Sequence, residues 1–286
     1  MRPIRRLSPA RERLYGMLAC VSVCAVLQGC VSVAVEEKTD PAARIERPEL
    51  AVRWVTESAE YRALTRQVFR NAEAVLEELI ADPDWSALPD RPADPSLPPA
   101  VILDVDETVL DNSPFQVLLG DTPFNRRDWD RWVARSDAEA VPGAVEFLAR
   151  ARAAGVRVFL VTNRDCMRRP GSDEACPQEG DTLENLRRIG VPADAEHLLL
   201  SGERPEWTDE KMIRRRFVAR EHRVIMVFGD DLGDFIDCPR GRVIPPCERP
   251  ATAADRLRAV RKYADYWGRG WFVLPNPMYG SWTSVR

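Results

Sequence analysis

Histidine is scarce in this sequence, with only His197 and His222 among 286 residues. Neither stands in an Arg-His-Gly context, so we expect no histidine nucleophile and interpret both residues as structural. Positive charge is not in excess either, because 41 Lys and Arg face 45 Asp and Glu, which gives a net charge of −4. A chain with this balance lacks the basic surface that binds nucleic acid, so no nucleic-acid partner is expected.

Long apolar runs are also missing. Residues 14–27 form an apolar stretch of about 14 residues, whereas a helix needs about 20 to span a bilayer. Several arginines precede this stretch, and it leads into Val-Leu-Gln-Gly-Cys, an order that resembles a lipoprotein signal peptide. We therefore expect residues 1–29 to be the signal peptide, Cys30 to carry a lipid and residues 30–50 to be a polar tether. An uncleaved anchor or a plain secretory signal is the alternative.

The residue after the lipidated cysteine bears on location. Val31 rather than aspartate follows Cys30, which resembles the sorting pattern of outer-membrane lipoproteins. The expected location is therefore the outer membrane, with the folded domain facing the periplasm and the membrane as a partner through the lipid anchor.

Cysteine pairs of the Cys-x-x-Cys type, which are common in zinc sites, are absent. Cys20 and Cys24 would leave with the signal peptide. Beyond the lipidated position, the remaining cysteines are Cys166, Cys176, Cys238 and Cys247. In an oxidising compartment this number suggests two disulfides, for which three pairings can be drawn. Loops of about ten residues between neighbours favour Cys166–Cys176 and Cys238–Cys247; zinc binding by all four is the alternative.

The most informative stretch begins at Pro99 and reads Pro-Ala-Val-Ile-Leu-Asp-Val-Asp-Glu-Thr. Its apolar run predicts a short buried strand that delivers Asp104 and Asp106 at its carboxyl end. In open α/β sheets ligands bind outside the carboxyl ends of strands. Two buried carboxylates are costly unless a cation or a reacting group compensates. The pattern therefore favours a Mg²⁺-dependent phosphoryl-transfer site over an exposed acidic turn.

Matching residues appear downstream. The apolar run 224–228 ends in Asp230, Asp231 and Asp234, and the strand-like run 157–161 ends in Thr162. Lys211 lies between these two runs, at the start of a helix-like segment.

Along the chain, the order of these features is an aspartate pair, a threonine, a lysine and a second acidic cluster. The four motifs of the haloacid dehalogenase superfamily of phosphatases have this order, and the sequence resembles that superfamily. Flanking segments are similar to the class C acid phosphatases, the bacterial lipoprotein 5′-nucleotidase family. These segments are residues 54–64, 128–133, 141–147 and 274–282. The similarity thus extends over nearly all of the chain after about residue 50, although residues 164–181 depart from it.

The resemblance implies an acid phosphatase that requires Mg²⁺. Asp104 would be the nucleophile that forms an aspartyl phosphate. Asp106 would act as general acid towards the leaving group and then as general base towards water. The Mg²⁺ ligands would be the carboxylates of Asp104 and Asp230 and the backbone carbonyl of Asp106, with Asp234 helping directly or through water.

The resemblance also implies roles for other polar residues. Thr162 and the backbone amide of Asn163 would hold phosphate oxygens, and Lys211 would supply a fixed positive charge. Asp231 is interpreted as a loop residue rather than a ligand, and Glu107 as a residue that caps a helix start.

Aromatic residues near the motifs suggest the substrate. Four aromatic residues lie near the motifs: Phe115, Trp129, Trp132 and Tyr279. We expect at least one of them to contact a nucleobase, because bases stack well on such rings; packing in the core or the cap is the alternative for each. Residues 112–140, inserted after the first motif, are expected to form a small helical cap over the pocket. The expected substrate partner is a small phosphomonoester, in particular a nucleoside 5′-monophosphate.

The pattern of apolar residues predicts an α/β fold: a Rossmann-like parallel sheet of haloacid dehalogenase type with helices on both faces. Residues 51–286 would form a single domain that begins with one long helix, residues 54–81. Strands are expected at 101–105, 156–161, 197–200, 224–228 and 271–274. Helices are expected at 142–154, 181–189, 208–221 and 251–266.

Two other classes of function stay open. One is a catalytically silent lipoprotein of the same fold that binds or stores a ligand. The other is a structural or adhesive surface protein whose acidic loops bind only a cation. Retention of Asp104, Asp106, Lys211 and Asp230 favours an active enzyme. The oligomeric state stays open too, with a homodimer as one alternative.

Overall fold

The computed structural model describes residues 50–285, all of which lie in one compact unit. The predicted signal peptide, Cys30 and nearly all of the tether lie outside the described residues. Within residues 50–285, no helix is long and apolar enough to cross a membrane.

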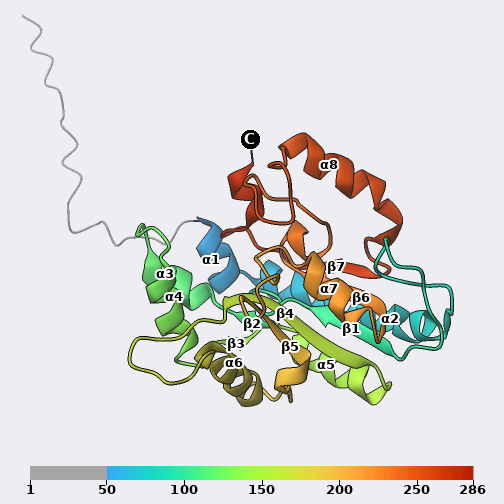
Figure 1. The fold of residues 1–286 in the computed structure, drawn as a ribbon, viewed down its shortest axis with the longest axis horizontal. Helices are drawn as coiled ribbons and strands as arrows, with labels where there is room; N and C mark the ends of the chain where they lie inside the picture. The colour runs from blue at the N-terminus through green and yellow to red at the C-terminus, as the bar shows by residue number, and fades with distance from the viewer. Residues whose placement is uncertain (1–49, 286) are drawn as a thin grey trace, which may run out of the picture. The chain divides into compact units, whose positions relative to one another are not determined.

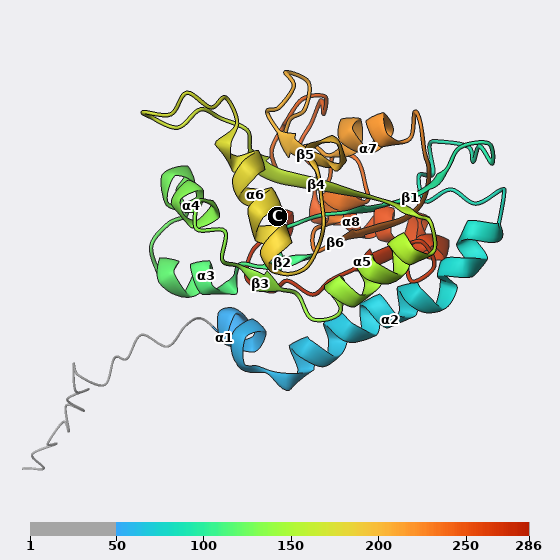
Figure 2. The same cartoon turned by 90° about the horizontal axis from the view of Figure 1, so that it is seen from below.

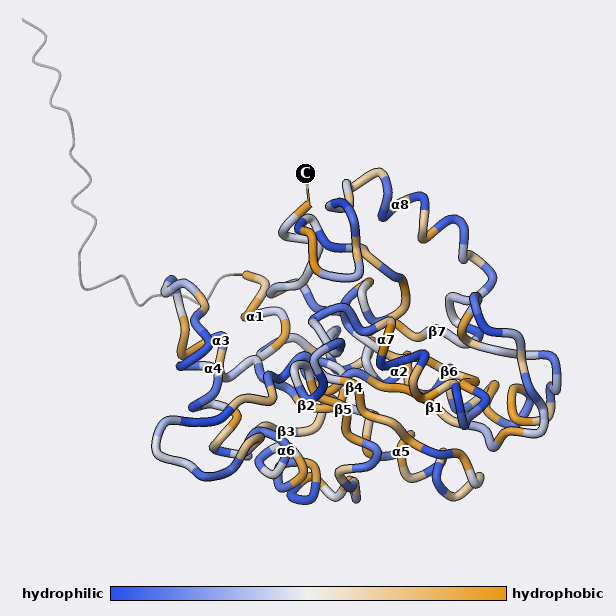
Figure 3. Tube along the Cα trace, in the orientation of Figure 1, coloured by the Kyte–Doolittle hydropathy of each residue, from blue (hydrophilic) through white to orange (hydrophobic). Residues whose placement is uncertain are grey.

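A parallel sheet of five strands forms the centre of this unit (Figure 1). Its order is β5 (Leu198–Ser201), β4 (Arg157–Asp165), β1 (Pro99–Leu103), β6 (Arg223–Gly229) and β7 (Trp271–Val273). In the parallel ladders, Leu103 pairs with Leu160 of β4 on one side and with Phe228 of β6 on the other. The strands are predominantly hydrophobic along their lengths (Figure 3) because both faces of the sheet are covered. The fold class predicted from the sequence is confirmed.

Helices cover the sheet on both sides (Figure 2). On one face, α2 (Ala59–Ala81), α5 (Ala144–Ala153) and α6 (Pro177–Arg188) contribute to the larger apolar cluster. The opposite face is covered by α7 (Met212–Val218) and by residues around the short helix η4 (Ala264–Tyr266). The strand order changes direction at β1, so the crevice expected for ligands lies at the carboxyl end of this strand.

The first helix differs from its prediction. Instead of one helix over residues 54–81, the structure has α1 (Leu50–Glu57) and α2, separated at Ser58. Ser58 has extended backbone angles, and its hydroxyl accepts the amide of Tyr61 at 3.1 Å. Serine is a preferred N-cap because it satisfies one of the free amides of the first turn. The apolar periodicity continues across the break, which is why it suggested a single helix.

Other boundaries shift by a few residues. The helix expected at 181–189 starts earlier, at Pro177, because proline suits the first turn of a helix. The helix expected at 208–221 is confined to α7. The one expected at 251–266 is α8 (Ala253–Lys262), followed by η4.

The segment predicted to be a cap contains α3 (Ser113–Leu119) and α4 (Arg126–Val133). Two short antiparallel strands, β2 (Leu110–Asp111) and β3 (Glu139–Ala140), flank these two helices. The insertion therefore leaves and rejoins the main domain at one place.

Both disulfides favoured by the loop lengths are present. Cys166 is joined to Cys176 in the loop after β4, and Cys238 to Cys247 in the loop after β6. Because all four thiols are used, the alternative of a zinc site does not fit the structure. The histidines are structural as expected, since His197 and His222 both pack against Phe159, with ring centroids 4.8 Å away.

Candidate active site

Three carboxylates meet at the carboxyl ends of two central strands. Asp104 follows β1, Asp230 follows β6, and Asp234 ends the short helix η3 (Leu232–Asp234). One oxygen of each lies within 4.8 Å of the others. The backbone amide of Asp104 donates to the carbonyl of Phe228 at 3.0 Å, which extends the pairing of β1 with β6 up to the site.

A lysine lies among these carboxylates. Lys211, the residue before α7, is buried and forms ion pairs with Asp104 and, at 2.6 Å, with Asp234. Burial alone would lower the pKa of Lys211, but the charges of Asp104 and Asp234 outweigh it and raise the pKa. The ammonium group therefore stays charged beside Asp104.

Negative charge is nevertheless in excess. Burial, followed by the charges of Asp234 and Asp106, raises the pKa of Asp104 to about 7, although Lys211 acts against this shift. The pKa of Asp230 is raised by burial and then by Asp104 and Asp234. One lysine thus does not balance the cluster. Oxygen-only donors with unbalanced negative charge fit a hard divalent cation.

The loop after β6 is tightly hydrogen-bonded. The amide of Asp231 donates to Asp234 at 2.9 Å, while the carboxylate of Asp231 accepts the amide of Gly233 at 2.8 Å. Gly229 has no side chain, and a Cβ there would collide with the carboxylate of Asp234. The side-chain amide of Asn276 donates to Asp230 at 2.7 Å. Asp231 therefore acts as a loop residue that orients its neighbours.

Asp106 is held by residues from two segments, β4 and the start of the cap. Its carboxylate accepts hydrogen bonds from Asn112 (2.9 Å), Thr162 (3.0 Å) and Arg164 (2.8 Å). The sequence reasoning missed Asn112 and Arg164. For Arg164 a signal was available, because an arginine next to Thr-Asn at the end of an apolar strand needs a partner when it is buried.

Thr162 and Asn163 are engaged differently from expectation. The Thr162 side chain is fully buried, and its hydroxyl donates to Asp106 rather than lining the cavity. Asn163 does line the cavity, and its side-chain amide donates to the carbonyl of Asp209 at 3.0 Å. In this structure Thr162 therefore binds the carboxylate of Asp106, the residue assigned as the general acid.

Glu107 was expected to cap a helix start, and the structure places it in the interior. It is buried, its φ is 62°, and its Oε1 accepts the amide of Asn112 at 2.9 Å. Oε2 has no hydrogen-bond partner among residues 50–285. Burial, followed by the charges of Asp106 and Asp111, raises the pKa of Glu107 well above its usual value. Its contact with Asn112 fixes the loop that carries Asp106.

A cavity of about 720 Å³ opens over the acidic cluster. Trp129 from α4 and Tyr279 from the C-terminal segment, two of the aromatic candidates for contact with a nucleobase, line it. Phe124, which the sequence reasoning missed, also lines it. Phe115 is buried behind Trp129, with ring centroids 5.1 Å apart, so it supports the wall of the cavity instead of forming it.

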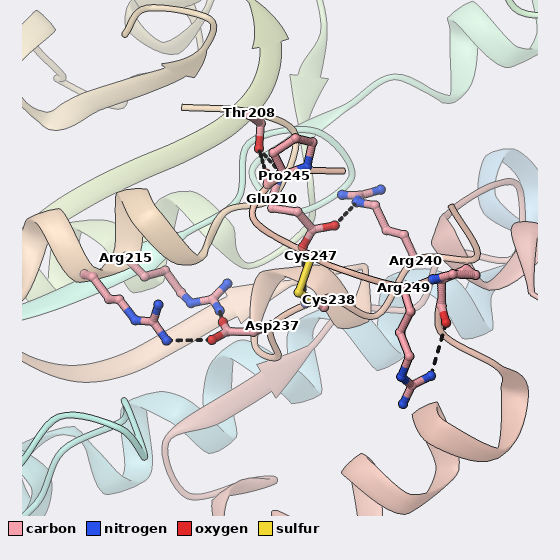
Figure 4. The surroundings of a disulfide bond; sticks show 11 residues. Thr208, Glu210, Arg215, Asp237, Cys238, Arg240, Pro245, Cys247 and Arg249 are labelled. Carbon is pink, nitrogen blue, oxygen red and sulfur yellow. Dashed lines mark hydrogen bonds and ion pairs between the residues drawn. A yellow bond between two sulfur atoms is a disulfide. The ribbon is translucent and has the colours of Figure 1, made fainter. Parts of the chain in front are cut away.

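The Cys238–Cys247 loop fastens the segment that precedes Lys211 (Figure 4). The buried carboxylate of Glu210 accepts the amide of Cys238 at 3.3 Å and pairs with Arg240 at 3.2 Å. Two residues before Glu210, the hydroxyl of Thr208 donates to the carbonyl of Pro245, within the same disulfide loop, at 2.8 Å. The loop therefore restrains the position of Lys211 through its immediate neighbours.

A parallel α/β sheet with carboxylates and a lysine at its carboxyl edge defines a phosphoryl-transfer class of enzyme. The sequence matches the family described as HAD superfamily, subfamily IIIB (Acid phosphatase), over residues 21–282. The chain belongs to this family and is therefore a phosphomonoesterase.

Solved structures agree. The class C acid phosphatase from Bacillus anthracis with tungstate bound is 30% identical, with a TM-score of 0.67 over 83% of this chain and 86% of that chain. A second structure of the Bacillus anthracis class C acid phosphatase aligns over the same shares at 30% identity, with a TM-score of 0.66.

Proposed function

We propose that this acid phosphatase hydrolyses nucleoside 5′-monophosphates through an aspartyl-phosphate intermediate on Asp104 and requires Mg²⁺. The observation that carries the proposal is the contact of Asp104 with Lys211 beside Asp230 and Asp234. This contact supports Asp104 as a nucleophile that Lys211 holds in place. The excess negative charge of the three carboxylates supports a bound cation.

In the first step an oxygen of Asp104 attacks phosphorus while the bond to the leaving oxygen breaks. Asp106 gives its proton to that oxygen. In the second step Asp106 takes a proton from water, which attacks the aspartyl phosphate and frees Asp104. Lys211 stabilises negative charge on the phosphoryl oxygens as it builds up.

The metal site would use the carboxylates of Asp104, Asp230 and Asp234 and the backbone carbonyl of Asp106. When bound, Mg²⁺ would neutralise phosphate charge that otherwise repels the attacking carboxylate.

The cavity supports the choice of substrate. Its volume of about 720 Å³ lies in the range of small-molecule sites. Trp129, Phe124 and Tyr279 give it aromatic walls on which a base can stack. A simple alkyl phosphate has no ring that could stack on these aromatic side chains.

We further propose that a lipid on Cys30 tethers the enzyme to the outer membrane on the periplasmic side. Charged nucleotides cross a membrane poorly, so removal of phosphate there would yield a nucleoside that can be imported. Labelling with radioactive palmitate checks the anchor: wild type should be labelled and Cys30→Ser should not. An unlabelled, soluble wild type would contradict this part of the proposal.

Phosphate release from p-nitrophenyl phosphate and from a nucleoside 5′-monophosphate, with and without EDTA, tests the activity. The proposal expects turnover at mildly acid pH that EDTA abolishes and added Mg²⁺ restores. A silent binding protein or a structural lipoprotein would release no phosphate under any of these conditions.

A further inference from the structure

The two oxygens of the Asp106 carboxylate have unequal surroundings. Oδ1 accepts three N–H groups: Nδ2 of Asn112 at 2.9 Å, and Nε and Nη2 of Arg164 at 3.0 and 2.8 Å. Oδ2 accepts the hydroxyl of Thr162 at 3.0 Å, while Nε of Arg164 is 3.4 Å away. Oδ1 therefore accepts three close N–H groups, whereas Oδ2 accepts one close hydroxyl and shares Nε of Arg164 at the longer distance, so Oδ2 is the less occupied of the two oxygens.

Further contacts fix Asn112 and Thr162 as hydrogen-bond donors to Asp106. Nε1 of Trp132 donates to Oδ1 of Asn112 at 2.7 Å. Because an indole nitrogen is only a donor, this contact turns the NH₂ group of Asn112 towards Asp106. The hydroxyl of Thr162 accepts the amide of Arg164 at 3.0 Å, so its single hydrogen is directed to Asp106.

Arg164 is itself fixed from several sides. Its side chain is 1% exposed, and Nη1 donates to the hydroxyl of Thr182 on α6 at 3.1 Å. The guanidinium group also lies over the ring of Trp129, 5.8 Å from the centroid, within the range of a cation–π contact. A planar fork held at one end presents Nε and Nη2 to Asp106 in one orientation.

We infer that Arg164 is a positioning residue that, with Asn112, occupies Oδ1 of Asp106 so that the proton passes to the leaving group from Oδ2. This inference rests on the role of Asp106 in the proposed function. The O–H bond of the Asp106 carboxylic acid at Oδ2 breaks and its proton joins the leaving oxygen, while the carboxylate that remains is held by Arg164 and Asn112. Loss of Arg164 lets the carboxylate rotate, and the acid then meets the leaving oxygen less often.

A purely structural ion pair makes a different prediction. If Arg164 only joins β4 to the loop after β1, its removal harms all substrates equally. If it positions the acid, the damage depends on the leaving group. An alkoxide needs the proton to depart, whereas p-nitrophenolate leaves without one.

The test compares kcat/KM for an alkyl phosphate and for p-nitrophenyl phosphate, since kcat/KM covers the steps up to departure of the leaving group. Asp106→Asn sets the reference. We expect Arg164→Met to reduce kcat/KM for the alkyl phosphate by about 100-fold or more and that for p-nitrophenyl phosphate by less than about tenfold. Arg164→Lys should recover part of the loss.

Two further variants separate positioning from stability. Thr182→Val removes a contact to the far side of the guanidinium group and should shift the ratio of the two kcat/KM values in the same direction, by a smaller factor. Arg223→Met removes another buried arginine, which donates to the carbonyls of Leu79 and Asp82 at the end of α2. This control should lower thermal stability and leave the ratio unchanged.

The outcomes are distinct. Equal losses on both substrates in Arg164→Lys and Thr182→Val would overturn the inference even if Arg164→Met does not fold. An Asp106→Asn variant without dependence on the leaving group would overturn the general acid of the proposed function, and the inference with it. Wild type without any phosphate release would instead refute the proposed function at its first step.

Discussion

Asp231 holds Ser281, although the two residues are 50 positions apart in the chain. The carboxylate of Asp231 accepts the hydroxyl of Ser281 at 2.8 Å and also its backbone amide. This contact joins the acidic loop after β6 to the C-terminal segment that carries Tyr279. Burial would raise the pKa of Asp231, but these hydrogen bonds and that of Gly233 lower it.

Asp231→Ala should therefore loosen one wall of the cavity. Asp231 is the N-cap of η3, and the loss of an N-cap costs about 0.5–2 kcal/mol of stability. We also expect KM for a nucleotide to rise because Tyr279 is no longer held. Thermal melting and steady-state kinetics measure the two effects. Asp231→Asn, which keeps an oxygen acceptor, is the matched control with a smaller change in both; an unchanged KM in Asp231→Ala would contradict the link to Tyr279.

Asp104→Asn should reduce hydrolysis of every phosphomonoester by several orders of magnitude, because an amide is not a nucleophile towards phosphorus. Acid-quenched wild type should also carry covalent phosphate during turnover, and the variant should carry none. Full activity in Asp104→Asn would remove the assignment of the nucleophile.

Trp129→Ala and Tyr279→Ala should each weaken binding of a nucleoside 5′-monophosphate by about 1–3 kcal/mol, the usual worth of a stacked base. The loss should fall mainly in KM, since the ring contacts the ground and transition states alike. Glycerol phosphate, which has no ring to stack, provides the comparison. Equal kcat/KM for nucleotides and glycerol phosphate in wild type would leave a phosphatase without nucleotide preference.

The two disulfides should differ in their effect on catalysis. Replacing either pair by serines costs about 2–4 kcal/mol of stability. Only the Cys238→Ser/Cys247→Ser variant should also lower kcat at temperatures where the protein stays folded, because that loop restrains the segment before Lys211. Cys166→Ser/Cys176→Ser is the matched control, and an equal fall of kcat in both would argue against the restraint.

The cap helix α4 should loosen in acid. Burial raises the pKa of Asp130, but hydrogen bonds from Arg169 and Gln178 outweigh it and lower the pKa. A lowered carboxylate pKa contributes stability that is present above the unfolded value, 3.8, and is lost as pH falls through the folded value. Melting temperatures of wild type and Asp130→Asn should therefore differ near neutral pH and converge below pH 3.8; a constant difference would contradict this account.

The position of the site could be predicted because buried strands can be recognised in the sequence as short apolar runs. Apolar runs that end in Asp104, Thr162 and Asp230 place these residues on one edge of a parallel sheet, and this placement does not depend on the conformation of the loops. Lys211 came from the family resemblance, and the structure brings it to Asp104.

The remaining contacts depend on directions that a linear pattern does not contain. Arg164 follows Thr162 by two residues on the same strand, yet only the packing of α6 behind it decides that its side chain reaches Asp106. Phe115 and Trp129 looked alike in sequence, and only the folding of the cap determines which of them faces the cavity. The break at Ser58 was hidden because the apolar stripe continues through it.

The Cys238–Cys247 bond has a consequence for when the enzyme becomes competent. Disulfides form in oxidising compartments and are kept reduced in the cytosol. A newly made chain that has not been exported would lack the restraint on the residues next to Lys211. With the export and the substrate proposed above, full activity would be acquired only on the far side of the inner membrane, and the nucleotide pool of the producing cell would be spared.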